Sequence, residues 1–272
     1  MCLIVFAYRV HPDYPIIIAA NRDEFYDRPT RMLGQWTDGS NIIAGQDLEG
    51  GGTWMGMTES GRLAALTNYR EPGVRMAAAP SRGHLVSDFL QGPDSLNHYL
   101  RELELKSNNY NGFNILLSEG GRWVYYSNRG STPKELSPGI HGLSNRALNT
   151  PWPKVIRSCR AVEERLSAHQ PPDMEDLMQV LQDRTVPPDE DLPRTGLELE
   201  WERRLGSIFI RSDIYGTRSS TVLLVAKDGS AHICERTFDR HGPTGEVELK
   251  RQFPVGPTIA HPLPVTGARE RS

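Results

Sequence analysis

The sequence has few cysteines and no disulfide framework. Its three cysteines, Cys2, Cys159 and Cys234, are far apart in the chain and form no CxxC pair. Small secreted domains that depend on disulfides carry many closely spaced cysteines, which this chain lacks. We therefore expect free thiols in a reducing compartment, and the predicted location is the cytoplasm. Cys159 falls on the apolar stripe of a predicted helix, so it is interpreted as a core residue.

Long hydrophobic runs and an excess of one charge are also missing. No apolar stretch approaches the ~20 residues that a membrane-spanning helix needs, and no basic segment typical of a signal peptide precedes the first apolar run. The net charge of -3 at pH 7 gives no general attraction to nucleic acid or to an anionic membrane. With 272 residues, 38% hydrophobic and 24% charged, the chain is predicted to be a soluble globular protein. We expect no nucleic-acid partner and no membrane span.

Motifs for metals and nucleotides are absent as well. The histidines His84, His141 and His232 stand alone and lack the spacing of metal ligands, so no metal site is predicted. Residues 50–53 are rich in glycine but lack the Lys-Ser/Thr pair of a phosphate-binding loop and the spacing of a dinucleotide fingerprint. This run is interpreted as a tight turn before a strand.

The most informative pattern lies in the first 24 residues. Two apolar runs, residues 3–7 and 15–20, are bridged by a short polar turn, which predicts a β-hairpin. Because hairpin strands are antiparallel, the start of the first strand lies beside the end of the second. Cys2 is therefore expected to lie next to the four polar residues that end the second run, Asn21, Arg22, Asp23 and Glu24.

Cys2 has two interpretations. Removal of Met1 would give Cys2 a free α-amino group with a pKa of about 7.7–8.0, and this amine can accept the thiol proton, so that nucleophile and base belong to one residue. Alternatively, Cys2 is a small apolar residue that begins a strand, since free cysteines are often buried. In that case Arg22 and Asp23 are an ion pair that fixes the hairpin, and Glu24 is structural.

Short hairpins dominate the rest of the chain, with helices in the middle. Glycine-containing turns separate the apolar runs, so neighbouring strands are expected to be antiparallel. Strands are predicted at residues 54–58, 62–67, 113–118, 123–127, 139–143, 207–211, 219–226, 232–238 and 246–253, and helices at 81–90, 94–104, 152–169 and 173–183. Loops are predicted at residues 25–47 and in the acidic segment 185–199, and a turn at 214–218.

These elements predict an α+β fold. Many of the strands are apolar on both faces and therefore need cover on both sides. Two mostly antiparallel sheets stacked face to face, with helices outside, meet this requirement as a four-layer αββα sandwich. We expect a single domain over residues 1–253 and a proline-rich tail over residues 254–272.

Two further strands end in asparagine, at Asn68 and Asn145. Asparagine is a common turn residue, so each could simply terminate its strand. Alternatively, the side-chain amides could donate hydrogen bonds to the oxyanion of an acyl-transfer reaction. In that chemistry Arg22 or Arg218 would lower the pKa of the Cys2 thiol.

Several blocks of the sequence resemble one family. MCLIVFAY and AANRDEFYDRPT are similar to the family named for its Asn-Arg-Asp-Glu motif, the transport and Golgi organisation protein family. GGTWMGMTESGRLAALTNYREP, HGLSNRALNTPWPKV and YGTRSSTVLLV also resemble blocks of that family, so the resemblance extends from Met1 to about Phe238. The family in turn resembles the N-terminal nucleophile (Ntn) hydrolases, αββα proteins that include penicillin V acylase and bile salt hydrolase.

The resemblance implies roles for individual residues. It makes Cys2 the nucleophile, Asp23 the carboxylate that holds its amine, and Asn68 and Asn145 contributors to the oxyanion hole. Arg218 is the candidate for an arginine that supports the nucleophile. One departure is that the acylases carry arginine before asparagine, whereas here Asn21 precedes Arg22. The substrate is expected to contact Asn21, Arg22, Glu24, Trp54 and Tyr69.

Three functions are compatible with these patterns. The first is an Ntn-type hydrolase that acts through Cys2 on a non-peptide amide or on an acyl ester or thioester. The second is a non-catalytic carrier with the same pocket, for which the resemblance implies haem or an acyl-CoA or lipid ligand. The sequence has no CxxCH motif, so Cys2 or a histidine would be the axial ligand of a haem, and no other cofactor is expected. The third is a scaffold of the secretory pathway, against which the lack of a targeting segment argues.

Overall fold

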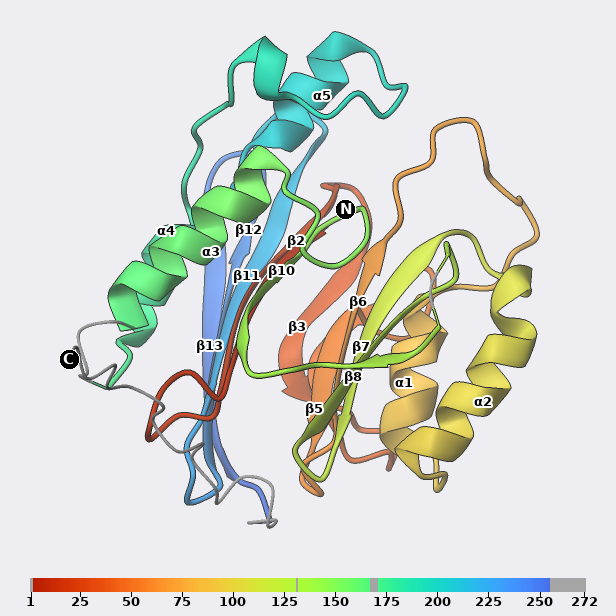
Figure 1. The fold of residues 1–272 in the computed structure, drawn as a ribbon, viewed down its shortest axis with the longest axis vertical. Coiled ribbons are helices and arrows are strands. Elements are labelled where there is room, and N and C mark those ends of the chain that lie inside the picture. Colours follow the sequence, from red (N-terminus) through yellow and green to blue (C-terminus); the bar gives the residue numbers. More distant parts are fainter. Residues whose placement is uncertain (1, 131, 167–170, 255–272) are drawn as a thin grey trace, which may run out of the picture.

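The computed structural model describes residues 2–130, 132–166 and 171–254 and contains two antiparallel sheets stacked face to face (Figure 1). The six-stranded sheet has the order β10-β1-β2-β11-β12-β13, and the seven-stranded sheet has the order β3-β4-β5-β6-β7-β8-β9. The strands are β1 (Cys2–Tyr8), β2 (Ile16–Phe25), β3 (Thr30–Gln35), β4 (Ile42–Asp47), β5 (Met55–Thr58), β6 (Leu63–Asn68), β7 (Phe113–Glu119), β8 (Arg122–Ser127), β9 (Lys134–Glu135), β10 (Gly139–Leu143), β11 (Tyr215–Val225), β12 (Ser230–Phe238) and β13 (Pro243–Gln252).

Helices cover the outer face of each sheet, which gives the molecule four layers (Figure 1). α1 (Gly83–Gln91) and α2 (Leu96–Lys106) pack on the seven-stranded sheet. α3 (Pro153–Leu166) and α4 (Met174–Leu181) pack on the six-stranded sheet. α5 (Leu199–Gly206) lies beyond one end of the sheets. This arrangement confirms the predicted α+β fold and the four-layer αββα sandwich.

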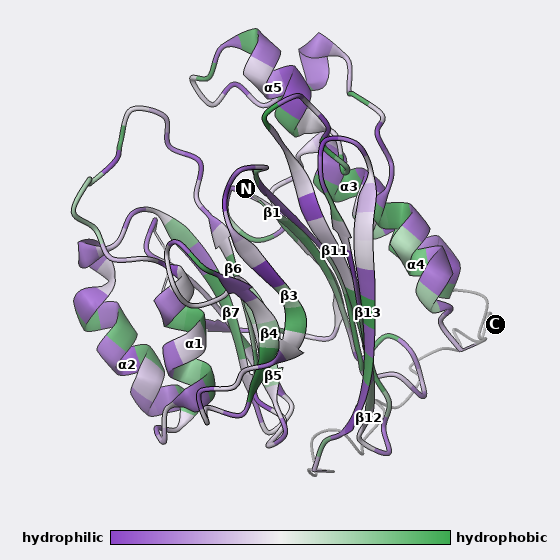
Figure 2. Cartoon of the chain, turned by 180° about the vertical axis from the view of Figure 1, so that it is seen from behind, coloured by the Kyte–Doolittle hydropathy of each residue, from purple (hydrophilic) through white to green (hydrophobic). Residues whose placement is uncertain are grey.

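β1 shows why so many strands are apolar throughout. Ile4, Phe6 and Tyr8 point into the core between the sheets, where the Phe6 ring lies 4.3 Å from Trp123 between centroids. The residues between them, such as Val5, pack against the helix layer instead. A strand that is buried on both faces has no solvent-facing position, so its sequence does not alternate. Figure 2 shows the same pattern, with hydrophobic residues concentrated along the strands and polar residues on the outer sides of the helices.

The predicted N-terminal hairpin is confirmed. β1 pairs with β2 so that Cys2 lies opposite Arg22 and Leu3 lies opposite Asn21. The connecting turn is closed by a hydrogen bond of 2.8 Å from the Arg9 N–H to the Pro15 carbonyl. Because successive side chains alternate between the faces of a strand, Cys2 and Arg22 share the face that points between the two sheets.

The predicted loop over residues 25–47 is wrong, because this segment contains β3 and β4. β3 is an edge strand with mostly exposed or half-buried residues, and its register with β4 shifts between Arg31 and Gly34. An edge strand with a bulge presents little of the apolar pattern by which strands are recognised. The strand predicted at 246–253 is confirmed as β13, which lies at the other sheet's edge.

Two predictions near the C-terminal strands are also wrong. Residues 207–210 form no strand pairing, and Arg211 forms only an isolated bridge with Gly216. Phe209 is held instead by a hydrogen bond of 2.8 Å from its N–H to the Asp183 carbonyl. Residues 215–218 of the turn predicted at 214–218 belong to β11, which already pairs with β2 at Tyr215. α5, which precedes this segment, is not predicted from the sequence.

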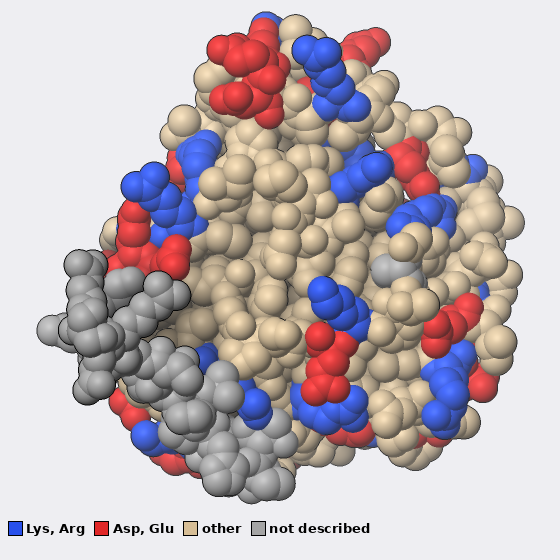
Figure 3. Space-filling model, viewed as in Figure 1, with Lys and Arg blue, Asp and Glu red and all other residues tan. Residues whose placement is uncertain are grey.

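Parts of two predictions lie outside the described residues. The helix predicted at 152–169 is confirmed over Pro153–Leu166, and residues 167–170 are not described. Residues 255–272 of the predicted tail are likewise outside the described ranges. Within those ranges, no helix combines the length and the apolar character that crossing a membrane requires. On the face shown in Figure 3, charged side chains of both signs are interspersed.

Candidate active site

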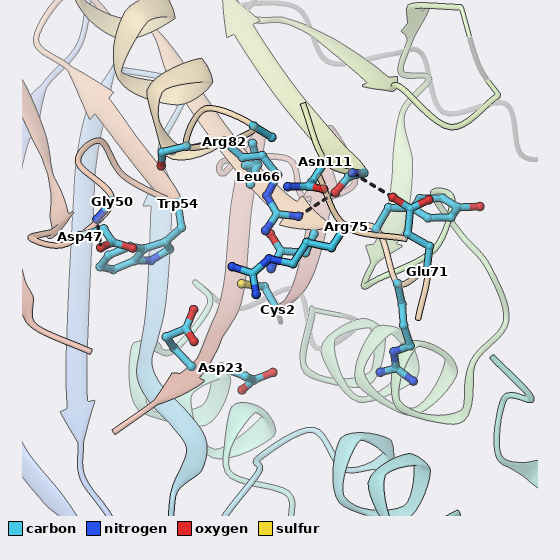
Figure 4. Close-up of a pocket in the computed structure, with 18 of the residues that line it drawn as sticks. Cys2, Asp23, Asp47, Gly50, Trp54, Leu66, Glu71, Arg75, Arg82 and Asn111 are labelled. Atoms are coloured by element: carbon cyan, nitrogen blue, oxygen red, sulfur yellow. Dashed lines mark hydrogen bonds between the residues drawn. The ribbon is translucent and has the colours of Figure 1, made fainter. Parts of the chain in front are cut away.

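A cavity of about 700 Å³ opens at the end of the sandwich where β1 begins (Figure 4). Its walls come from the ends of β1, β2 and β6, from the glycine turn before Trp54, and from residues 69–83, which lead into α1. Cavities of roughly 300–1,000 Å³ hold small organic ligands. Seven of the predicted site residues line this cavity: Cys2, Arg22, Asp23, Glu24, Trp54, Asn68 and Tyr69.

Arg22 forms one wall of the cavity on the same sheet face as Cys2. Its guanidinium lies over the Trp54 ring, with 4.3 Å from Cζ to the ring centroid. Nη1 donates to Thr30 Oγ1 at 3.2 Å, and Nη2 lies 3.5 Å from Asp47 Oδ2. These contacts fix the guanidinium against the cavity wall. Because Arg22 follows Asn21 in the sequence, Arg22 is the residue that lies opposite Cys2 in the strand register.

Asp23 is the carboxylate next to Cys2 at the end of β2. It is 1% exposed, and its Oδ1 accepts a hydrogen bond of 2.8 Å from Thr217 Oγ1. The Tyr215 hydroxyl donates to the Asp23 backbone carbonyl at 3.0 Å. Burial raises the pKa of Asp23, while the charge of Lys154 and the Thr217 hydrogen bond lower it. The carboxyl group is therefore held in one orientation by β11.

The Cys2 thiol is not activated by its surroundings alone. Burial raises the pKa of Cys2, and the negative charge of Asp23 acts in the same direction. The Arg22 guanidinium and the backbone N–H of Asp23 lower this pKa without reversing the shift. A reaction through the thiolate would therefore need a base that removes the proton when the substrate is bound.

The two asparagines at strand ends lie in different environments. Asn68 lines the cavity, whereas Asn145 is fully buried and is not among the lining residues of the described chain. Asn145 Nδ2 donates to the Asn68 carbonyl at 2.9 Å, and its own carbonyl accepts the Arg70 N–H at 2.7 Å. Ser144, the residue before it, donates from Oγ to the Cys2 carbonyl at 3.1 Å. In this structure Asn145 holds the strand ends that surround Cys2.

Besides Asn145, two predicted site residues lie away from the cavity lining of the described chain, Arg218 and Asn21. The Arg218 Nη1 donates to the carbonyl groups of Phe25 and Arg28, at 2.8 and 3.0 Å. A register shift between Thr217 and Ser219 marks a bulge at Arg218. Asn21 lies on the helix side of β2, where Nδ2 donates to the Leu181 and Ile208 carbonyls at 2.8 and 2.9 Å. Both residues therefore fix the backbone around β2 in this structure.

Lys154 is a buried lysine beside this site that is not among the residues predicted from the sequence. It lies in the first turn of α3, is 1% exposed, and its Nζ has no hydrogen-bond partner among the described residues. Burial lowers the pKa of Lys154 to about 8, whereas the charges of Asp23 and Cys2 raise it. The first turn of a helix favours anions over cations. The position of a lysine directly after Pro153 was the signal that could have identified it.

Lys154 is expected to make stability increase as pH rises from about 8 to its unfolded-state value of 10.5. In that range the folded protein has released a proton that the unfolded chain still binds, so the free energy of unfolding rises with pH. This lowering of the Lys154 pKa corresponds to about 3 kcal/mol of free energy. Below pH 8, where the buried lysine is charged, the folded protein is destabilised by this full amount. Urea unfolding from pH 7 to 10.5 should show this slope in wild type and lose it in Lys154→Met. The exposed Lys134→Met is the control, and an identical slope in Lys154→Met would contradict the assignment.

Arg70 and Glu202 form a buried ion pair behind the cavity. Arg70 Nη1 lies 2.8 Å from Glu202 Oε2, and the two side chains are 3% and 5% exposed. The Arg70 guanidinium also lies 4.7 Å from the centroid of the Trp152 ring. Glu202 Oε1 accepts hydrogen bonds from the N–H of Thr195, at 3.0 Å, and from its hydroxyl. The pair joins the segment after β6 to α5 and to the loop before it.

The functional groups that line the cavity are amino-acid side chains. Within the described residues no group of three or more histidine, cysteine, aspartate or glutamate side chains is arranged to hold a metal ion. The cavity instead combines one thiol, a buried carboxylate, an amide and several guanidinium groups. These are the parts that acyl transfer to a thiol uses: a nucleophile, a carboxylate that can orient a base, and donors for an oxyanion.

Two solved structures were compared with this fold. The C2A mutant of the conjugated bile acid hydrolase from Clostridium perfringens matches with a TM-score of 0.50 and 8% identity, over 94% of this chain and 98% of that chain. A Caenorhabditis elegans ortholog of N-acylethanolamine-hydrolyzing acid amidase matches with a TM-score of 0.47 and 15% identity, over 82% of this chain and 92% of that chain. At 8% identity the bile acid hydrolase match shows a common Ntn-hydrolase fold.

Sequence relatives identify the family. The mouse Transport and Golgi organization 2 homolog is 36% identical over 259 residues, which cover 88% of this chain and 93% of the relative. The Drosophila melanogaster Transport and Golgi organization protein 2 is 29% identical over 286 residues, with 94% and 100% coverage. The sequence model of the family described as Transport and Golgi organisation 2 matches residues 1–240. The chain therefore belongs to the Transport and Golgi organisation 2 family.

Proposed function

We propose that this protein is a cysteine hydrolase of the Ntn type, which cleaves a small non-peptide amide or an acyl ester or thioester once Met1 has been removed. The observation that carries the proposal is the position of Cys2, which lines an open cavity of about 700 Å³ together with Asp23 and lies opposite Arg22. The fold shared with the conjugated bile acid hydrolase, which was solved with its own second-position cysteine replaced, supports it.

Cys2 supplies both the nucleophile and the base in the proposed reaction. Its α-amine takes the thiol proton, and Sγ attacks the substrate carbonyl carbon. The oxyanion collapses to an acyl-thioester, and the leaving amine, alcohol or thiol takes the proton from the α-ammonium group. A water that is deprotonated by the same amine then hydrolyses the thioester and releases a carboxylic acid. Asp23, which is oriented by Thr217, holds the amine in this scheme.

Asn68 is the side-chain oxyanion donor in the proposed reaction. Its side-chain amide lines the cavity and makes no hydrogen bond to another described residue. The Asn145 amide, in contrast, already donates a hydrogen bond to the Asn68 carbonyl. We expect Asn68→Ala to lower kcat by about 10²–10³-fold, because this is the usual effect of removing one oxyanion donor. KM should change little, since the interaction forms in the transition state. Steady-state kinetics that show a raised KM at constant kcat would assign Asn68 to ground-state binding instead.

The proposal is tested by intact mass and by a substrate screen. Mass spectrometry of the purified protein shows whether Met1 is present, and a retained Met1 would contradict the amine mechanism. The screen compares acyl amides and acyl-CoA thioesters, with wild type and Cys2→Ala side by side. Turnover that is equal in the two proteins rejects the hydrolase.

A second candidate is a carrier that binds haem or an acyl-CoA or lipid ligand in the same cavity. It is favoured by the orientation of the Asn145 amide toward the Asn68 carbonyl and by the raised pKa of the Cys2 thiol. Cys2 and Tyr69 are the described lining residues of a type that ligates haem iron. Slow alkylation of Cys2 by iodoacetamide at neutral pH would favour the carrier. A haem Soret band that persists in Cys2→Ala would exclude Cys2 as the axial ligand.

A further inference from the structure

Two arginines of the cavity have no acidic partner. Arg75 and Arg82 lie on the segment between β6 and α1, and in Figure 4 both side chains extend over Cys2. Among the described residues, no carboxylate lies within ion-pair distance of either guanidinium. Arg82 Nη1 donates to the Gly112 carbonyl at 2.9 Å, and Arg75 makes no hydrogen bond to the described part of the chain.

Two of the acidic residues that line the cavity, Glu71 and Asp47, are engaged by other groups. Glu71 accepts two hydrogen bonds from Arg129, each of 2.7 Å. Asp47 accepts the Nε–H of Arg28 at 2.8 Å and the backbone N–H of Gly50 at 2.9 Å. These contacts occupy the oxygens of both carboxylates, so Glu71 and Asp47 do not neutralise the two arginines.

The two unpaired arginines affect each other. Burial lowers the pKa of Arg82, the charges of Glu24 and Cys2 raise it, and the charge of Arg75 lowers it further. Repulsion between neighbouring cations is screened less in a partly buried cavity than at an open surface. A bound anion would remove this repulsion by pairing with both groups, and the planar guanidinium fork matches a carboxylate or a phosphate.

We infer that Arg75 and Arg82 bind an anionic group, a carboxylate or a phosphate, at one end of the substrate whose carbonyl lies at Cys2. The inference rests on the proposed function, because it specifies the substrate class of the same cavity. That class is an acyl amide or thioester that carries a negative charge away from the bond to be cleaved. Arg75 is exposed and Arg82 is half-buried, so the anion would enter past Arg75 and lie between the two groups.

Binding is measured by calorimetry in the Cys2→Ala background, in which the proposed reaction cannot occur. The probes are N-hexanoylglycine, N-hexanoyl-O-phosphoethanolamine, the suberic acid monoamide of ethanolamine, and neutral N-hexanoylethanolamine. They place a carboxylate or a phosphate on the amine side, a carboxylate on the acyl side, or no charge. We expect at least one anionic probe to bind about tenfold more tightly than the neutral probe, since hydrogen bonds to charged groups are the stronger ones.

Arginine variants assign the preference to the two side chains. Arg75→Gln and Arg82→Gln should each lower the affinity for the preferred anionic probe by about tenfold. The affinity for the neutral probe should not change. Arg101→Gln removes an exposed positive charge on α2 and is the matched control, with no expected effect. Circular dichroism melts show that the variants fold.

Two results overturn the inference: no anionic probe binds more tightly than the neutral one, or the preference survives in the double variant. The proposed function fails on a separate measurement, the turnover of the same probes by wild type. Arginine-dependent anion binding without turnover would reject the hydrolase and retain the anion site. If neutral and anionic probes are turned over alike and the arginine variants have no effect, the hydrolase is retained and the anion site is rejected.

Discussion

Cys2→Ala is expected to lower the turnover of the preferred acyl substrate by about 10⁶-fold, which is the scale of removing the nucleophile of a hydrolase. The variant keeps the α-amine, the cavity and the arginines, but it has no sulfur to form the acyl-thioester. The other two thiols cannot replace it, because Cys159 and Cys234 lie in the layer between the six-stranded sheet and its helices. Single-turnover release of the amine or thiol product measures the effect.

Matched variants separate the loss of the nucleophile from other effects of substitution. Cys159→Ser removes a thiol of the same chain outside the cavity and should keep wild-type turnover. Cys2→Ser keeps a small nucleophile and the α-amine, so it should retain more activity than Cys2→Ala. A Cys2→Ala protein that turns over substrate at the wild-type rate would contradict the proposed mechanism, as would a wild-type enzyme that is active with Met1 in place.

The N-terminal hairpin could be predicted from the sequence because its determinants are local. Two apolar runs and a polar turn fix the pairing of β1 with β2, and the register then places Cys2 opposite Arg22. β3 could not be predicted in this way. It is an edge strand that pairs with β4, and most of its residues are exposed or half-buried, so its sequence lacks a clear apolar pattern. Residues 207–210 show the opposite case, since they are apolar and buried by packing, with Ile208 against Leu3, and form no strand pairing.

The candidate site was predictable to the extent that it is made of strand ends. Cys2, Asp23 and Asn68 end neighbouring strands of the two sheets and line one cavity. Lys154 and Arg82 reach the same region from segments far away in the sequence. The lysine directly after Pro153 marks an unusual helix start, but no local pattern predicts that the two side chains lie near Cys2. The bulge at Arg218 also has no sequence signal, although it decides that this side chain holds backbone carbonyls.

Glu202→Ala is expected to lower the free energy of unfolding by about 3–5 kcal/mol, the usual cost of breaking a buried ion pair from one side. The substitution leaves the Arg70 guanidinium buried with its charge uncompensated, and the Nε and Nη2 of that group already lack partners in the described chain. It also removes the acceptor of the Thr195 N–H. Urea unfolding at pH 7 measures the loss.

The double replacement Arg70→Leu with Glu202→Leu shows whether the loss comes from an uncompensated charge or from lost packing. Removing both charges abolishes the desolvation penalty together with the attraction, so the double variant should be far more stable than Glu202→Ala and close to wild type. The double-mutant cycle should therefore give a large favourable coupling between the two sites. Additive losses would mean that the ion pair does not hold the two segments together. In that case α5 is fastened by apolar contacts such as Leu205 with Ile210 and Tyr215.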